Sequence, residues 1–183
     1  STSKIAGNVR FDPLLAGGAV MDIGCYCVSF ARLFAGREPE SVHTVGHVHE
    51  TGVDDYAAAV LDFGDGLIAN LACGMTVQAD NTAHLGGETG HLMIPIPWKP
   101  PVHNAVLEVA AMTPPKQDQK AGKTQGPYQE RITVDAPGPL YGMEAEDFAR
   151  AVAGQQPPAV SRQDTIGNMR VLDTMRRQIG LPY

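Results

Sequence analysis

The sequence predicts an α+β domain in which helices pack on one face of an open, mostly antiparallel sheet. Three observations predict it: helical periodicity near both ends of the chain, alternating or β-branched runs between them, and short turns joining those runs. Short turns connect antiparallel strands, because parallel strands need long crossovers. The 183 residues correspond to one domain by length, and 43% hydrophobic residues suffice for a core.

The first predicted helix covers residues 17–34. It opens at Gly17-Gly18 and stops at Gly36, a residue type that favours a helix C-terminus. Residues 1–16 lack this periodicity and are expected to be irregular. The apolar stripe at helical spacing consists of Cys27, Val28, Ala31 and Phe34.

Six or seven strands are expected in the middle of the chain. Residues 63–66 form a hairpin turn by type, and residues 86–90 are expected to form a second hairpin loop. The expected strands cover residues 41–50, 55–63, 66–75, 79–85, 91–96, 104–112 and 129–134. The alternating small residues compatible with a flat sheet face are Ala57, Ala59, Ala69 and Ala72.

Residues 113–127 are rich in Pro, Gly, Gln and Lys, which predicts a mobile surface loop. Two further helices are expected after it. The last one starts at Ser161-Arg162-Gln163-Asp164, a capping pattern. The stripe of the first consists of Ala145, Phe148, Ala149 and Val152, and that of the second of Ile166, Met169, Leu172, Met175 and Ile179.

The net charge of −6 argues against nucleic acid as a partner, because such binding needs a basic face that releases counterions. It also argues against an anionic membrane surface. The most apolar stretch, residues 16–30, carries Asp22 near its middle, so we expect no transmembrane segment. With no signal-peptide pattern and three cysteines, the expected setting is reducing and cytoplasmic.

Three histidines suggest an alternative, a divalent metal site. His43, His47 and His49 fall on one face of a strand, because strand side chains alternate with period two. Asp54 or Asp55 could complete the ligand set. However, His47 and His49 would stand about 7 Å apart and His43 about 13 Å further along. One ion cannot reach all three without a strong bulge, so we expect no metal.

Asp22 and Tyr26 are the pair best suited to chemistry. Four residues apart on the first predicted helix, they project from one face about one turn apart. Gly17, Gly18 and Gly24 would let a ligand or another backbone approach closely. An Asp in an apolar run costs free energy unless it is paired. The alternative is that Asp22 caps the helix and the Tyr26 hydroxyl merely faces water.

Several runs resemble the C-terminal domain of the Gfo/Idh/MocA oxidoreductases, and together they cover nearly the whole chain apart from residues 113–127. Tyr26 places the resemblance in the branch of dihydrodiol dehydrogenase, glucose–fructose oxidoreductase and NADP-dependent xylose dehydrogenase. The matching runs are Asn8-Val9-Arg10-Phe11-Asp12-Pro13, Gly17-Gly18-Ala19-Val20-Met21-Asp22-Ile23-Gly24-Cys25-Tyr26-Cys27, Gly52-Val53-Asp54-Asp55, Gly86-Gly87-Glu88-Thr89-Gly90, and Glu144-Ala145-Glu146-Asp147-Phe148 followed by residues 164–177.

The resemblance implies that Tyr26 is the acid/base at the substrate oxygen, with Asp22 beside it. It implies that Asn8 and Arg10 contact the substrate or the cofactor phosphates. The implied substrate is a small sugar, polyol or diol. A free Tyr has a pKa near 10 and needs a nearby cation to act as a base at neutral pH. The family's lysine from a Glu-Lys-Pro motif does not occur in this sequence.

The resemblance also implies NAD or NADP as the cofactor, bound mainly by an N-terminal Rossmann domain. This sequence contains no Gly-x-Gly-x-x-Gly run, so the chain alone is expected to be inactive as a dehydrogenase. Residues 1–183 are then the substrate-binding and catalytic domain. The family further implies a homodimer or homotetramer through the helix-free sheet face. The alternative function is a non-catalytic dimerisation or ligand-binding module derived from that domain.

Overall fold

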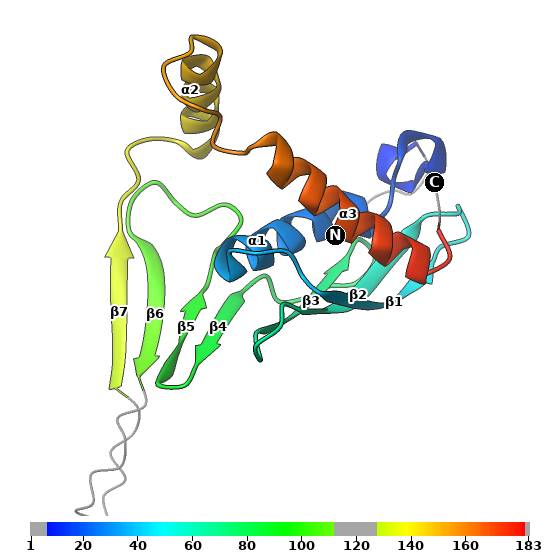
Figure 1. Cartoon of the computed structure of the whole chain (residues 1–183), viewed down its shortest axis with the longest axis horizontal. Helices are drawn as coiled ribbons and strands as arrows, with labels where there is room; N and C mark the ends of the chain where they lie inside the picture. Colours follow the sequence, from blue (N-terminus) through cyan, green and yellow to red (C-terminus); the bar gives the residue numbers. More distant parts are fainter. Residues whose placement is uncertain (1–6, 112–127, 182–183) are drawn as a thin grey trace, which may run out of the picture. The chain divides into compact units, whose positions relative to one another are not determined.

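The computed structural model describes residues 7–111 and 128–181 (Figure 1). The loop expected at residues 113–127 lies outside the described residues. The described chain forms two compact units: unit 1 contains the residues up to Ala79 and from Val160 onward, and unit 2 contains Asp80–Ala159. Each unit has its own antiparallel sheet, which confirms the predicted α+β class and divides the expected strands between two sheets.

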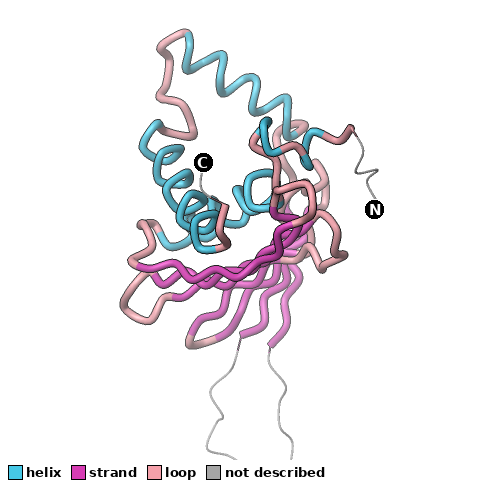
Figure 2. Tube along the Cα trace, turned by 90° about the vertical axis from the view of Figure 1, so that its right-hand side faces the viewer, coloured by secondary structure: helices cyan, strands magenta, loops and turns pink. Residues whose placement is uncertain are grey.

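Unit 1 is a three-stranded sheet covered by helices on one face (Figures 1 and 2). Its strands are β1 (Ser41–Val48), β2 (Asp54–Asp62) and β3 (Ile68–Gly74), hydrogen-bonded in that order. Two short 3₁₀ turns, Val9–Phe11 and Pro13–Leu15, come first. The covering helices are the π-helical turn η3 (Val20–Gly24), α1 (Cys25–Ala35), which continues it, and α3 (Arg162–Gln178).

The helix-covered face of this sheet provides the core. Alternation along the strands puts Ala57, Ala59 and Leu61 of β2 on that face, where all three are buried. Three of the four alanines that were compatible with a flat sheet face, Ala57, Ala59 and Ala69, therefore lie on the helix-covered side. The core cluster consists of Ala19, Val20, Val28, Ala57, Ala59, Leu61, Phe63, Cys73, Val171, Leu172 and Met175.

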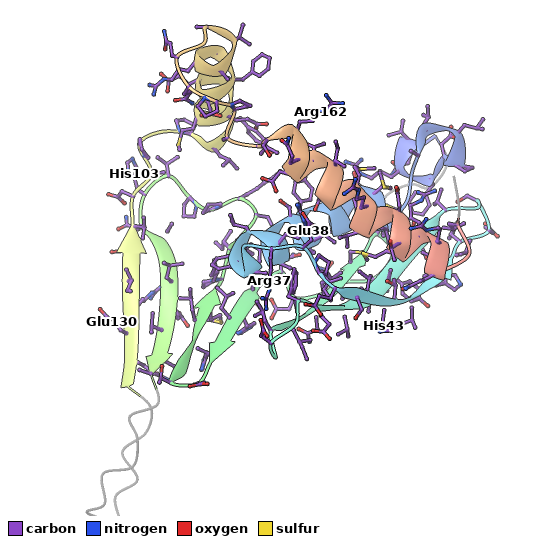
Figure 3. All side chains as sticks on the ribbon, viewed as in Figure 1. Arg37, Glu38, His43, His103, Glu130 and Arg162 are labelled. Atoms are coloured by element: carbon purple, nitrogen blue, oxygen red, sulfur yellow. The ribbon has the colours of Figure 1, made fainter. Side chains whose placement is uncertain are left out.

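The opposite face of the unit 1 sheet is open and largely apolar, and we call it the open sheet face. The strand register places its residues in neighbouring rows: Val45 beside Ala58, which faces Ala72, and His43 beside Val60. His43 lies on β1 on the side turned away from α3 (Figure 3). The exposed residues of this face are His43, Val45, His47, Tyr56, Ala58, Val60, Ile68, Asn70 and Ala72.

Helix ends in unit 1 follow the predicted capping chemistry. Gly36 ends α1 with a left-handed backbone, φ 65°, which only glycine adopts without strain. The Ser161 hydroxyl accepts a hydrogen bond from the Asp164 amide at 3.0 Å and caps α3 as expected. Along α3, Leu172 and Met175 of the predicted stripe are buried. The more N-terminal Ile166 and Met169 are exposed.

A buried arginine fastens α1 to α3. The Arg32 guanidinium donates to Glu38 at 2.8 Å and to the Asp164 carbonyl at 3.1 Å, and it lies 3.3 Å from the Asp164 carboxylate. Gly167 of α3 leaves room for this contact, because a Cβ at this position would displace the guanidinium and the Glu38 carboxylate. Hydrogen bonds from Arg32 are the main cause that holds the pKa of Glu38 below its usual range.

Unit 2 consists of a four-stranded sheet and one helix, α2 (Leu140–Val152). The sheet turns at residues 88–89, so Gly86 and Gly87 lie in a strand rather than in the expected hairpin loop. The predicted stripe on α2 is not buried among the described residues, since Phe148 and Val152 are 68% and 72% exposed. The strands are β4 (Ala83–Gly87), β5 (Gly90–Ile94), β6 (Ala105–Ala111) and β7 (Tyr128–Val134), in that order.

One stretch of the described chain, Pro13–Ala35, is long and apolar enough to cross a membrane by length and composition. Core helices pass the same test. Here Val20 and Val28 are fully buried in the unit 1 core, and Asp22 carries an ion pair. The absence of a transmembrane segment therefore stays a prediction.

Truncating a core side chain of α3 should destabilise the protein strongly. Leu172 is 1% exposed, so Leu172→Ala should lower the free energy of unfolding by about 2–5 kcal/mol, through lost burial and the cavity left behind. Urea denaturation followed by circular dichroism measures the change. The control is Val152→Ala on the exposed side of α2, which should stay within about 0.5 kcal/mol of the wild type. Equal losses for the two variants would contradict the assigned core.

The Arg32–Glu38 interaction should make stability depend on pH. Because the pKa of Glu38 is lowered in the folded state, the carboxylate stabilises the fold fully above the ordinary Glu pKa of about 4.3. That contribution is lost as the pH falls through the lowered pKa. Unfolding of the wild type and Glu38→Gln, measured from pH 7 to pH 3, should show a difference that shrinks toward acid. A constant difference would contradict the assignment.

Candidate functional site

Three of the four residues singled out by sequence meet at the start of the helical segment of unit 1. The Asn8 side chain accepts a hydrogen bond from the Arg10 amide at 3.1 Å and so caps the 3₁₀ turn Val9–Phe11. Arg10 Nε then donates to Asp22 Oδ2 at 2.7 Å. Both charged side chains reach solvent, so this ion pair fixes geometry more than it adds stability.

Tyr26, the fourth residue, lies four positions after Asp22 on the same continuous helical segment. It is 61% exposed. Asp22 belongs to the π-helical turn Val20–Gly24, and Tyr26 follows in the first turn of α1. Single π-helical turns cost stability and occur often at functional sites. The segment therefore offers a carboxylate, a guanidinium and a phenol to solvent.

A buried carboxylate holds the turn that precedes this segment. Asp54, at the start of β2, is 0% exposed, and its Oδ2 accepts a hydrogen bond from the Val20 amide at 2.6 Å. Gly18 has φ 126°, and a Cβ there would collide with Asp54 Oδ1. The close fit explains the glycine: a side chain at position 18 would displace the carboxylate from the helix start.

Residues of α3 and β3 make further contacts with the same segment and with the turn before it. Arg176 Nη1 donates to the Gly17 carbonyl at 3.5 Å, and Asn168 Nδ2 donates to the Cys25 carbonyl at 3.2 Å. Gly24 lies against Cys73, whose sulfur would be 3.2 Å from a Cβ at position 24. Burial raises the pKa of the Cys73 thiol to about 12, so this sulfur is a packing atom and not a nucleophile at neutral pH.

Burial shifts the pKa values of two ionisable groups near this segment, Asp54 and Cys25. Burial raises the pKa of the Asp54 carboxyl, and the Val20 amide and the charge of Arg176 act in the opposite direction. Burial also raises the pKa of the Cys25 thiol, and the negative charge of Asp22 raises it further. Cys25 is therefore protonated at neutral pH and is a poor candidate for a nucleophile beside Asp22.

The histidines of the alternative metal site do not converge. β1 has a bulge between His47 and Val48, so His49 lies beyond the strand. His47 Nδ1 is 2.7 Å from Asp55 Oδ1, and His49 Nδ1 is occupied by contacts with Thr51. Within the described residues, no group of three or more His, Cys, Asp or Glu side chains could hold a metal ion.

Sequence reasoning missed the residues that support the site. From the sequence, Asp54 was a possible metal ligand and part of a family-matching run, and Asn168 and Arg176 lay within the matching residues 164–177, but none of the three was given a role at the helix start. The one available signal was an Asp at the start of an apolar strand, since a buried carboxylate needs a partner. That signal does not name the partner, which here is a backbone amide 34 positions earlier.

The chain is similar to known proteins both in sequence and in fold. The chain is 42% identical over 91 residues to human trans-1,2-dihydrobenzene-1,2-diol dehydrogenase, covering 49% of this chain and 27% of that protein. It is 31% identical over 172 residues to D-xylose 1-dehydrogenase (NADP(+)) 2 of Haloferax volcanii, covering 93% of this chain and 48% of that protein. The chain thus spans half or less of the relatives it matches.

Solved structures agree on the fold. A 3-ketoreductase from Actinomadura kijaniata, crystallised with NADP and TDP-benzene, superposes with a TM-score of 0.76 at 24% identity, over 97% of this chain and 51% of that one. At this identity the likeness concerns the fold alone. The family model of the GFO/IDH/MocA C-terminal domain matches residues 2–93, the half of the chain that contains Asn8, Arg10, Asp22, Tyr26 and Asp54. The chain therefore belongs to the GFO/IDH/MocA C-terminal domain family.

Proposed function

We propose that this chain is the substrate-binding and catalytic domain of an NAD(P)-dependent oxidoreductase acting on a CH–OH group of a sugar, polyol or diol. The observation that carries the proposal is the Arg10–Asp22 ion pair one helical turn before an exposed tyrosine, Tyr26. The relatives supply the substrate class, since one is named a diol dehydrogenase and another a xylose dehydrogenase.

Tyr26 acts as the acid/base in this proposal. Interconversion of an alcohol and a carbonyl needs a proton at the oxygen in addition to a hydride at the carbon. A phenol moves that proton well only when a nearby cation favours its anion. The resemblance assigns that cation to the lysine of the separate N-terminal domain, and the 2.7 Å bond to Asp22 keeps the Arg10 guanidinium in place beside the helix start. Asn8 fixes the turn that carries Arg10.

No residue of the described chain is assigned to the nicotinamide cofactor. Every strand pair in residues 7–111 and 128–181 is antiparallel, whereas a dinucleotide site needs a parallel βαβ unit. NAD or NADP would accordingly be held mainly by a separate N-terminal domain of the complete gene product. The chain by itself would then have no dehydrogenase activity.

The open sheet face is proposed as the contact with a second copy of the chain. Its apolar residues Val45, Val60 and Ile68 are exposed in a contiguous part of the sheet. Exposed apolar patches on a regular element mark interaction sites, and a two-fold dimer buries the same patch on both subunits. A homodimer, or a homotetramer built from such dimers, covers this face.

Replacing Tyr26 by Phe should disable the chemistry. In the complete gene product, Tyr26→Phe should lower kcat by about 10²-fold or more, because the ring stays and only the proton-carrying hydroxyl is lost. Steady-state assays with a sugar, polyol or diol and NAD or NADP measure the effect. The control, Tyr141→Phe on exposed α2, should keep the wild-type kcat. An unchanged kcat for Tyr26→Phe would favour the non-catalytic dimerisation or ligand-binding module.

A charge on the open sheet face should break the dimer. Val60→Glu places a carboxylate where the two copies would exclude water, and an unpaired buried charge costs several kcal/mol, about 3–5. Light scattering after size exclusion should show the monomer mass for this variant. Leu33→Glu, on the exposed side of α1, should keep the wild-type mass. A dimer that survives Val60→Glu would place the interface elsewhere.

A further inference from the structure

Two buried charged residues hydrogen-bond to the glycine-containing turn at residues 17–20. Both are too buried to contact a substrate. Asp54 is fully buried and Arg176 is 8% exposed. Asp54 holds the Val20 amide at 2.6 Å, and Arg176 holds the Gly17 carbonyl at 3.5 Å. They come from different elements, β2 and α3, so the turn is fixed to both the sheet and the last helix.

This turn in turn determines where Arg10 and Asp22 lie. The Gly18 amide donates to the Arg10 carbonyl at 2.9 Å, and the Gly18 carbonyl accepts from the Asp22 amide at 3.0 Å. Gly17 lies so close to Arg10 that a Cβ would stand 2.5 Å from its carbonyl oxygen. One residue, Gly18, therefore ties together the backbones of both partners of the exposed ion pair.

We infer that Asp54 and Arg176 are positioning residues for the Arg10–Asp22–Tyr26 site, an inference that rests on the proposed function. Asp54 sets the height and rotation of the helix start through the Val20 amide, two residues before Asp22. Arg176 sets the other side of the turn through the Gly17 carbonyl. The tight space at Gly18 leaves the turn little freedom to adjust when either contact is lost.

The matched control lies one residue further along β2. Asp55 is also buried, but its carboxylate accepts from Thr76 at 2.7 Å and contacts His47, and within the described residues it makes no hydrogen bond to the turn. Removing either carboxylate takes a hydrogen-bonded acceptor out of the protein interior, so both Ala variants should lose stability. Only the loss of Asp54 should move the catalytic groups.

The decisive experiment measures kcat and its pH profile for Asp54→Ala, Asp54→Asn and Asp55→Ala in the complete gene product, corrected for folded fraction. Asp54→Ala should lower kcat by about 10- to 100-fold, because small misplacements of reacting groups have effects of this size. It should also change the pH profile, because Tyr26 follows the displaced helix start on the same helical segment. Asp54→Asn keeps an oxygen acceptor for the Val20 amide and should restore most of kcat.

Three outcomes overturn the inference: a wild-type kcat and pH profile for Asp54→Ala, an equal loss for Asp55→Ala, or no rescue by Asn. If Asp54→Ala fails to fold, Arg176→Met takes its place, and an unchanged kcat and pH profile there would overturn the inference as well. Tyr26→Phe in the same assay distinguishes failure of the positioning role from failure of the proposed function. A large loss for Tyr26→Phe with an unaffected Asp54→Ala rejects only the positioning role, whereas an unaffected Tyr26→Phe rejects the proposed function too.

Discussion

The hydrogen bond from the Val20 amide to the buried Asp54 carboxylate fixes the start of the helical segment that carries Asp22 and Tyr26. A helix start leaves several backbone amides without helical partners, and a carboxylate is a strong acceptor for them. Here the acceptor comes from a strand 34 positions away in sequence. One hydrogen bond therefore both caps the helix start and joins it to the sheet. The side chains of Asp22 and Tyr26, which follow on the same segment, are thereby held in place.

Burying this carboxylate has a cost that the surroundings offset in part, since the pKa of Asp54 stays raised. An ionised group inside a protein is unfavourable unless it is paired and hydrogen-bonded. The short bond to Val20 and the nearby charge of Arg176 provide both kinds of compensation. Arg32, the other buried arginine of the core region, fastens α1 to α3 in a similar way. Unit 1 thus uses buried charges at its helix contacts and apolar packing between helices and sheet.

Successive side chains along each strand of the unit 1 sheet point to opposite faces, and the two faces have different roles. Side chains of one parity meet α1 and α3 and form the core, and those of the other parity form the open sheet face. Small residues appear on both faces for different reasons. Ala57 and Ala59 let the helices approach closely, and Ala58 and Ala72 leave the open face flat. Residue type alone could not assign them, because the starting parity depends on how β2 enters the sheet.

Local chemistry in the sequence determined the α+β class, most strand positions, the Gly36 and Ser161 helix ends, and the placement of Asp22 and Tyr26 four residues apart on one helical segment. These features depend on neighbours in sequence, so periodicity and capping rules reach them. Tertiary structure alone decided the split into two sheets, the exposed stripe of α2, and the pairing of Arg10 with Asp22. It also decided that Asp54 and Arg176 hold the glycine turn, because those contacts join residues 34 and 159 positions apart.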